Sequence, residues 1–399
     1  MRFKPSYLII TILSLLFIAC HSDSQPAAAR SSNSKFHEMP VKTGPPALMY
    51  DTLSPQRRDI IAQLDNYYSK QVRAGFNGAV LIGYNGKIIY ERYFGYANKE
   101  RKIPWANSSS SQLASVSKTF TGAAILYLYE HKYLNIDDPV QHYIREFPYP
   151  NITIKMLLNH RSGLPDYTKW VPIFDHDHDS PVSNEQMIAM MARYAPSLEF
   201  RPNTRFKYCN TNFAVLARVI EKITDMTYYD FMSRYIFQPL GMAHTFVYDP
   251  ARGLPPNATI SYKRNWWREP DMFADGVYGD KGIYSSAEDM YRWDQSFYQN
   301  KLLSNDVIEL AYGPCSFEKP GIKNYGLGWR MLCYANGNKV IYHNGWWHGN
   351  NTSFYRFIKE NMTIVVLGNR FTNSIYHQAP AIYSIVKGAP VVHGFDTEE

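Results

Sequence analysis

The sequence predicts an α+β fold: one antiparallel sheet, flanked by N- and C-terminal helices, with a mostly helical lobe inserted between its strands. Strand patterns occur near both ends of the chain, at residues 78–97 and 325–367, whereas residues 113–321 show patterns typical of helices joined by long loops. Because an antiparallel sheet must bury at least one face, we expect the helical patterns at 54–74 and 375–386 to cover it.

The first twenty residues are predicted to be a lipoprotein signal peptide. Arg2 and Lys4 give a basic start, and the apolar run from Leu8 to Ala19 is too short for an ordinary membrane span. A small residue before a cysteine at the end of such a run resembles a bacterial lipoprotein cleavage site, so we expect lipidation of Cys20. The chain would then be exported to the cell envelope, lipid-anchored and facing the periplasm. An ordinary secretory signal cut elsewhere is the alternative.

The rest of the chain divides into a tether and one domain. Residues 21–53 are rich in Ser, Pro and Ala without an apolar period, which is typical of a flexible tether. We expect a single domain over 54–390. Its sheet lobe comprises 54–112 and 322–390, and its helical lobe is 113–321.

Within the domain, the order of elements follows from local patterns. Asn85-Gly86 lies between the short apolar runs 79–82 and 87–90, which is the strongest short signal for a hairpin. A helical pattern begins at Ser115 and continues to Tyr129. Further helical patterns lie at 216–223 and 288–298, and the later strand patterns at 325–332, 339–344, 353–358 and 362–367.

Composition excludes several classes of protein. The 399 residues are 45% apolar, enough for a large core, and the net charge of +7 is scattered rather than clustered. We therefore expect no nucleic-acid partner, and we expect a monomer.

The cysteines do not define a disulfide framework. An odd number of cysteines cannot all pair internally, and the three beyond Cys20 are Cys209, Cys315 and Cys333. A disulfide between Cys315 and Cys333 is left open.

Ser115 is the candidate nucleophile. In Ser115-Val116-Ser117-Lys118 the spacing of three puts Lys118 on the same helical face, one turn further on. A serine at a helix start lies near exposed backbone N–H groups that favour developing negative charge. A serine hydroxyl needs an adjacent base, and a lysine serves as one where burial or nearby positive charge disfavours its ammonium form.

Two later motifs accompany this pair in a fixed order. Tyr208-Cys209-Asn210 follows about ninety residues on, and His343-Asn344-Gly345 lies on a late strand pattern. This ordered triple resembles that of the serine β-lactamase and penicillin-binding protein superfamily. The similarity is to the branch with class C β-lactamases, D-alanyl-D-alanine carboxypeptidases and carboxylesterases. Passages typical of that branch, between residues 57 and 370, lie at 152–167, 206–212, 237–242, 279–285 and 325–329.

The resemblance implies a role for each motif residue. Ser115 would form an acyl-enzyme, while Lys118 and Tyr208 would pass protons between nucleophile, leaving group and water. The backbone N–H groups of Ser115 and Trp346 would form the oxyanion hole, and His343 would complete the catalytic set. No cofactor and no metal are implied. The substrate-binding residues would be Asn210, Asn344, Gly345 and Trp346.

Two departures from the family pattern bear on specificity. His343 stands where Lys is usual and is only partly charged near neutrality, and Asn344 lacks the hydroxyl that helps to bind a substrate carboxylate. Both weaken the case for a dedicated β-lactamase, although we expect His343 to offer some positive charge to carboxylate-bearing substrates. Cys209 replaces the usual Ser, and we expect it to be a packing residue facing inward.

Other notable residues are given structural interpretations. We expect His160 to satisfy buried backbone groups in a turn. The run Asp175-His176-Asp177-His178-Asp179 looks like a metal-ligand cluster but lies in a predicted surface loop without a distant ligand set. Trp346 and Trp347 follow the strand motif, and at least one of them is a candidate wall of the acyl pocket.

The sequence therefore predicts a serine hydrolase that acts through an acyl-enzyme on small esters or D-amino-acid peptides. A class C-type β-lactamase is the alternative enzyme. A penicillin-binding or sensing protein that acylates without turnover is the alternative from another class. The expected partners are a small-molecule or peptide substrate and, through the lipid anchor, a membrane.

Overall fold

The predicted signal peptide, including Cys20, and most of the predicted tether lie outside the described residues. The computed structural model describes residues 36, 39, 41, 44–51, 55–175 and 180–388. Within that part of the chain, no helix has the length and apolar character that a membrane span requires.

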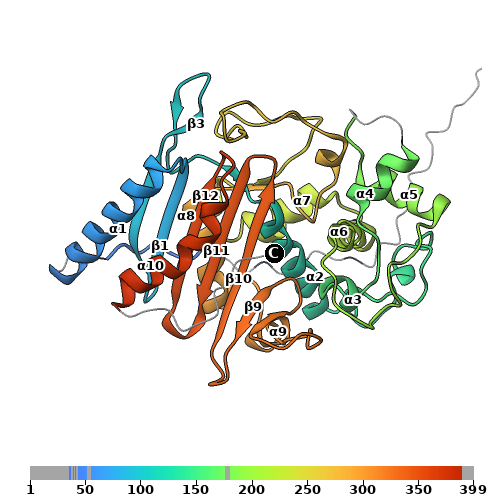
Figure 1. Cartoon of the computed structure of the whole chain (residues 1–399). Coiled ribbons are helices and arrows are strands. Elements are labelled where there is room, and N and C mark those ends of the chain that lie inside the picture. Colours follow the sequence, from blue (N-terminus) through green and yellow to red (C-terminus); the bar gives the residue numbers. More distant parts are fainter. Residues whose placement is uncertain are drawn as a thin grey trace, which may run out of the picture. The chain divides into compact units, whose positions relative to one another are not determined.

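The main sheet has seven antiparallel strands in the order β2-β1-β12-β11-β10-β9-β8 (Figure 1). β1 pairs along its whole length with β12, so strands from the two ends of the domain meet in one sheet, as predicted. The strands are β1 (Gly78–Tyr84), β2 (Lys87–Phe94), β8 (Lys323–Tyr325), β9 (Arg330–Cys333), β10 (Lys339–Trp347), β11 (Asn350–Phe357) and β12 (Met362–Gly368).

The predicted hairpin joins β1 to β2. Asn85 and Gly86 have φ values of 51° and 72°, the left-handed conformation that a two-residue turn of this kind requires at both positions. Asparagine tolerates this conformation better than most residues and glycine does so without steric cost. The local sequence is therefore sufficient to specify the turn.

The inner strands β1 and β12 are buried on both faces, and their side chains are mostly apolar on both sides. Along β12, Ile364 and Val366 pack in a cluster with the first and last helices, α1 (Pro55–Arg73) and α10 (Gln378–Lys387). These two helices lie together across one face in Figure 1. Val365 belongs to the larger cluster on the other face. The predicted covering of the sheet by terminal helices is confirmed.

The middle of the chain is mostly helical, as predicted. Its elements are η1 (Ala114–Val116), α2 (Ser117–Glu130), α3 (Ile154–Leu158), α4 (Tyr167–Phe174), α5 (Asn184–Tyr194), α6 (Asn210–Thr224), α7 (Tyr228–Met232), α8 (Ala287–Tyr298) and α9 (Asn305–Ala311). A small sheet of order β5-β7-β6 joins Ser111–Gln112, Ile283–Ser285 and Phe246–Val247.

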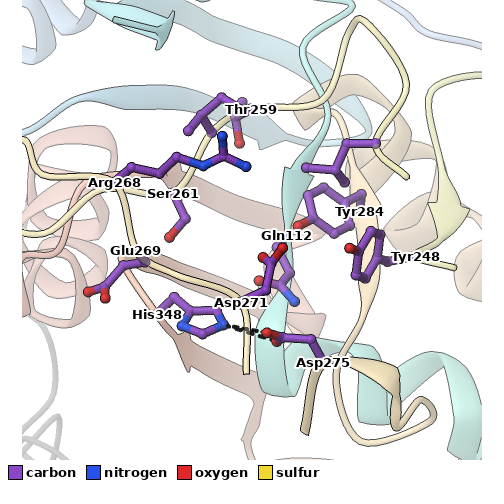
Figure 2. Close-up of a pocket in the computed structure, with 12 residues that line it drawn as sticks. Gln112, Tyr248, Thr259, Ser261, Arg268, Glu269, Asp271, Asp275, Tyr284 and His348 are labelled. Carbon is purple, nitrogen blue, oxygen red and sulfur yellow. Dashed lines mark hydrogen bonds and ion pairs between the residues drawn. The ribbon is translucent and has the colours of Figure 1, made fainter. Parts of the chain in front are cut away.

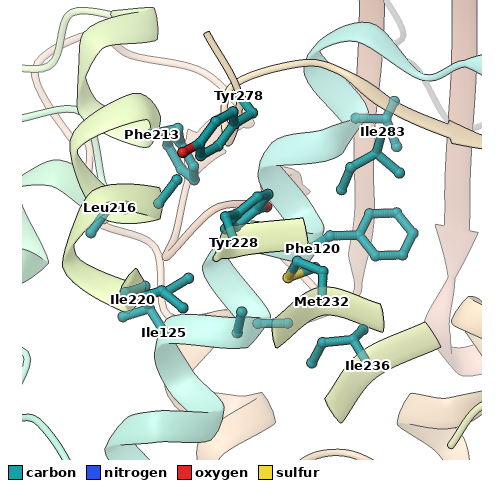
Figure 3. Packing of buried hydrophobic residues seen from close by; sticks show 14 of the residues in the cluster. Phe120, Ile125, Phe213, Leu216, Ile220, Tyr228, Met232, Ile236, Tyr278 and Ile283 are labelled. Atoms are coloured by element: carbon teal, nitrogen blue, oxygen red, sulfur yellow. The ribbon is translucent and has the colours of Figure 1, made fainter. Parts of the chain in front are cut away.

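Helix α2 is the core of this region. It is buried from Ser117 to Leu128, and Figure 3 shows Phe120 and Ile125 among apolar residues of α6 and α7. A helix that is buried on all sides has little freedom to shift. The first turn of α2 therefore has a well-defined position relative to the strands.

Helix α8 packs on the sheet as well as on the helical region, where the ring of Trp293 stacks on that of Phe120 of α2, whereas the sequence-based division places α8 in the helical lobe alone. A methyl group on Gly83 of β1 would lie 2.3 Å from the ring of Tyr291, which shows how closely α8 approaches. A buried ion pair joins the same helix to β11. Arg356 Nε and Asp294 Oδ1 are 2.5 Å apart, with side chains 1% and 0% exposed.

Candidate active site

Ser115 lies in a short turn at the entrance to α2. The sequence predicts a helix from Ser115, whereas the structure has the 3₁₀ turn η1 first and α2 from Ser117. Ala114 has a φ of 48°, an uncommon left-handed conformation that costs a residue with a side chain about 1–2 kcal/mol. Ser115 is partly exposed although its neighbours on both sides are buried. The turn thus presents one hydroxyl at the surface of a buried segment.

Lys118 is fully buried, and three acceptors surround its amine, two of them from segments distant in sequence. Nζ donates to Ser115 Oγ at 3.2 Å, to Asn210 Oδ1 at 2.8 Å and to the backbone oxygen of Asp280 at 2.9 Å. An ammonium has three N–H donors, so these contacts satisfy all of them. The contact with Ser115 is the one through which a neutral amine would take the serine proton.

Tyr208 is the third predicted catalytic residue, and it lies beside this pair. Lys118 Nζ is 4.9 Å from the centre of its ring, and the guanidinium of Arg330 is 5.0 Å away from the same ring. Its hydroxyl is buried, and no described residue makes a hydrogen bond to it. A buried hydroxyl without a partner is available to a reacting group.

Arg330 was not among the residues that the motifs predict. It lies in β9 directly after the Gly-Leu-Gly-Trp passage, and no motif marks it as a site residue. Its place over the Tyr208 ring follows from the pairing of β9 with β10, where Arg330 lies opposite Tyr342, one residue before His343. Only the strand register brings it to the site.

The prediction of a partial charge on His343 at neutral pH is wrong. The side chain is fully buried, and burial, together with the nearby charges of Arg330 and Lys118, holds the pKa of its imidazole well below its usual range. Its Nδ1 lies 2.7 Å from the backbone oxygen of Asn344, and its Nε2 lies 3.4 Å from the Tyr325 hydroxyl. His343 is therefore a neutral, hydrogen-bonded residue and offers no charge to a substrate.

His160 lies on the other side of the same tyrosine. Its Nε2 is 3.2 Å from the Tyr325 hydroxyl, and its Nδ1 accepts the backbone N–H of Cys209 at 3.2 Å. The predicted structural role of His160, satisfying buried backbone in a turn, is confirmed. Burial, with Lys118 as the next cause, also lowers the pKa of His160 well below its usual range.

The cysteines of the domain are free thiols. Cys209 is 3% exposed, and burial raises its pKa to about 12, so the predicted packing role is confirmed. Cys315 and Cys333 are partly exposed and unpaired, which answers the question of a disulfide between them.

Gly345 allows β10 to approach the nucleophile turn. A methyl group at this position would lie 2.2 Å from the backbone oxygen of Leu113 and 3.1 Å from the backbone nitrogen of Ser115. β9 pairs with β10 only as far as Tyr342, so this stretch of β10 has no β9 neighbour. The N–H of Ser115 therefore lies against β10 where Trp346, the other predicted oxyanion donor, follows.

The side chains after His343 diverge. The Asn344 amide nitrogen is 3.5 Å from the hydroxyl of Tyr355, a residue of the cluster under α1 and α10, and its amide oxygen is buried without a partner among the described residues. Trp346 is 62% exposed, and its ring centre lies 5.8 Å from that of Phe371. Trp347 is half-buried, so Trp346 is the indole that a substrate can reach from solvent.

The run from Asp175 to Asp179, which resembles a metal-ligand cluster in the sequence, lies largely outside the described residues, since 176–179 are not described. In the part of the chain that is described, no group of three or more His, Cys, Asp or Glu side chains is arranged to hold a metal ion.

A polar pocket next to the site is shown in Figure 2. It is lined by Gln112, by His348 at the tip of the β10–β11 hairpin and by Asp275 of the 3₁₀ helix η4 (Phe273–Gly276). His348 Nε2 and Asp275 Oδ1 are 2.9 Å apart. The predicted catalytic residues do not line this pocket, so it is a neighbour of the candidate site rather than the site itself.

Comparisons with known proteins show which family the chain resembles. Residues 59–384 match the family model described as Beta-lactamase. The chain is 34% identical over 320 residues to Penicillin-binding protein 4* of Bacillus subtilis, covering 76% of this chain and 70% of that protein. It is 23% identical to a D-aminopeptidase of Gluconobacter oxydans over 75% of this chain, but spans only 56% of that relative's length.

Solved structures share the fold. A penicillin binding protein from Bacillus halodurans superposes with a TM-score of 0.70 at 22% identity, covering 80% of this chain and 97% of that one. A D-amino acid amidase from Ochrobactrum anthropi gives a TM-score of 0.68 at 19% identity, covering 84% and 99%.

The close approach at Gly345 generates a first prediction. Gly345→Ala should lower kcat toward a chromogenic ester by on the order of 10²-fold, because the methyl group pushes β10 away from the Ser115 turn and opens the oxyanion hole. Circular dichroism and the thermal midpoint verify that the variant is folded. A folded variant with wild-type kcat would show that this approach does not matter to the reaction.

The two neutral histidines generate a second prediction. Below pH 6.5 the unfolded chain binds protons at His160 and His343 that the folded protein excludes, so the free energy of unfolding should fall as the pH drops. Each residue contributes up to about 1.4 kcal/mol per pH unit. Urea unfolding at pH 7.5, 6.5 and 5.5 measures the slope. His160→Gln and His343→Gln should each reduce it, and an unchanged slope in both variants would contradict the assignment.

Proposed function

The chain belongs to the Beta-lactamase family, and from this premise we propose that it is a serine hydrolase that turns over small esters or D-amino-acid peptides through an acyl-enzyme. The observation that carries the proposal is the contact of 3.2 Å between Ser115 Oγ and the fully buried amine of Lys118. A serine at a helix entrance with a buried amine beside it is the arrangement that nucleophilic catalysis requires.

In the acylation step, the neutral amine of Lys118 takes the hydroxyl proton while Ser115 Oγ attacks the carbonyl carbon. The oxyanion that forms accepts hydrogen bonds from the backbone N–H groups of Ser115 and Trp346. The tetrahedral intermediate then collapses. The bond to the leaving group breaks, and the Tyr208 hydroxyl, which has no hydrogen-bond partner among the described residues, delivers a proton to the leaving group. Tyr208 then regains a proton from Lys118.

In the deacylation step, water attacks the same carbonyl carbon. Tyr208 accepts the water proton as it passes its own proton to Lys118. The bond between the acyl carbon and Ser115 Oγ then breaks, and Lys118 returns a proton to the serine oxygen. The same two residues therefore serve both halves of the cycle. Their presence side by side, with the Lys118 amine 4.9 Å from the centre of the Tyr208 ring, favours a turnover enzyme over a protein that is only acylated.

Two observations favour neutral or amino-bearing substrates. His343 is uncharged, so the residue that stands at the usual lysine position supplies no cation for a substrate carboxylate. Relatives named D-aminopeptidase and solved structures of D-amino acid amidase support a D-amino acid in the acyl part. The exposed indole of Trp346 would wall the acyl side, which suits an apolar group.

We further propose a monomer without nucleic-acid partners, anchored in the cell envelope by lipid on Cys20 and facing the periplasm. Mass spectrometry of the mature N-terminus tests the anchor. The expected result is a chain that begins at a lipid-modified Cys20. An unmodified end downstream of that residue would exclude it.

A panel of substrates tests the activity. The soluble domain should turn over a nitrophenyl ester or a D-Ala-D-Ala peptide faster than a chromogenic cephalosporin. Ser115→Ala should reduce kcat to less than about 10⁻³ of the wild-type value with an unchanged thermal midpoint.

Each other outcome of this panel supports a different function. Fastest turnover of the cephalosporin would favour a class C-type β-lactamase, and stoichiometric labelling without turnover would favour a sensing protein. Full activity in Ser115→Ala would mean that another serine is the nucleophile.

A further inference from the structure

Three buried polar side chains beside Lys118 have no part in the mechanism above. Lys281 and Asp280 are 3% and 1% exposed, and Tyr167 is fully buried. Asp280 Oδ2 lies 3.4 Å from Lys281 Nζ and accepts the hydroxyl of Tyr167 at 3.0 Å, and Lys281 also contacts that hydroxyl. Burying charged groups costs free energy unless they are paired and hydrogen-bonded. A buried cluster of charged groups next to the Lys118 amine is therefore expected to have a role.

The backbone segment that carries Asp280 and Lys281 is hydrogen-bonded to α2. Thr121 Oγ1 donates to the backbone oxygen of Gly279 at 2.6 Å, and Lys118 Nζ donates to that of Asp280 at 2.9 Å. The N–H of Ile283 in turn donates to Ser117 Oγ at 3.1 Å. The carbonyl that receives the Lys118 amine is therefore one of three successive contacts between this loop and the first turns of α2.

The side chain of Lys281 reaches the other half of the site. Its ammonium lies 4.6 Å from the centre of the Trp347 ring, within the range of a cation–π interaction. Trp347 directly follows Trp346, the proposed oxyanion donor, and its indole N–H donates to Asp275 at 2.7 Å. Lys281 thus connects the segment that holds the Lys118 amine with the end of β10.

Tyr167 links the cluster to the remaining acceptor of Lys118. Its backbone N–H donates to Thr211 Oγ1 at 2.7 Å, and the carboxylate of Asp166 accepts the N–H of Asn210 at 3.0 Å. The cluster therefore contacts the segments that carry both Asn210 and Asp280. The cluster is linked to the amine through the backbone oxygen of Asp280, which accepts from Lys118 Nζ, rather than through its side chains.

We propose that Lys281 is a positioning residue for catalysis, which through Asp280 and Trp347 holds the Lys118 amine and the oxyanion strand in register. The inference rests on the proposed function of Ser115 and Lys118. A displacement of about 1 Å between reacting groups can cost a factor of about 10² in rate, so loss of this brace should act on kcat rather than on substrate binding.

The test compares Lys281→Met with the double variant Lys281→Met/Asp280→Asn. The single change leaves the Asp280 carboxylate buried without its cation, so it should lower the thermal midpoint as well as kcat. The double change removes both charges and should restore most of the midpoint. kcat toward the best ester should nevertheless stay about 10- to 100-fold below wild type in both variants, with KM within about threefold.

A matched control comes from the buried pair of Arg356 and Asp294, which belongs to β11 and α8. Arg356→Met should also lower the midpoint, yet kcat measured well below that midpoint should stay within about twofold of wild type. Where Lys281→Met does not fold, the double variant and Tyr167→Phe carry the test, and Tyr167→Phe should lower kcat severalfold.

The outcomes separate this inference from the proposed function. A wild-type protein that neither turns over an ester nor forms an acyl-enzyme at Ser115 would overturn the proposed function itself. An active wild type whose double variant regains both the midpoint and kcat would overturn the positioning role, because Lys281 would then act on stability alone. A restored midpoint with a low kcat supports it.

Discussion

The candidate site depends on the burial of a single amine. Lys118 has no exposed surface, so each of its N–H groups must find an acceptor inside the protein. One acceptor is Ser115 in the preceding turn, and the other two come from residues 210 and 280, in segments that are remote in sequence. A fold that satisfies this amine must bring the entrance of α2, the start of α6 and the loop before β7 together, and the site is a consequence of that convergence.

The surrounding frame keeps the convergence rigid. α2 is enclosed on all sides, and the turn that precedes it contains Ala114 in a strained conformation. Such strain persists only where neighbouring structure imposes it. β10 supplies that constraint, since Gly345 brings its backbone against the turn with no room for a side chain. The sheet and the helical region therefore position one serine between them.

Spacing and order in the sequence were sufficient for the features that depend on neighbours in the chain. They predicted the hairpin at Asn85 and the pairing of Ser115 with Lys118, because both rest on local geometry. The sheet shared by both ends was predicted from where the strand patterns lie along the chain, not from local geometry. Burial and register are properties of the folded chain, so the neutral state of His343 and the presence of Arg330 and Lys281 at the site were not predictable. The packing of α8 on the sheet was not predictable either, because its sequence indicates a helix but not the element against which the helix packs.

The hydroxyl of Tyr325 between two imidazoles has one further consequence. His160 Nδ1 accepts a backbone N–H, so its proton must be on Nε2, whereas His343 Nδ1 faces a carbonyl oxygen and must carry the proton itself. Tyr325 then accepts from one ring and donates to the other. The three groups form a chain of hydrogen bonds in which every donor points the same way, from His160 through Tyr325 to His343. The backbone N–H of Cys209 fixes the tautomer of His160, and the backbone oxygen of Asn344 fixes that of His343.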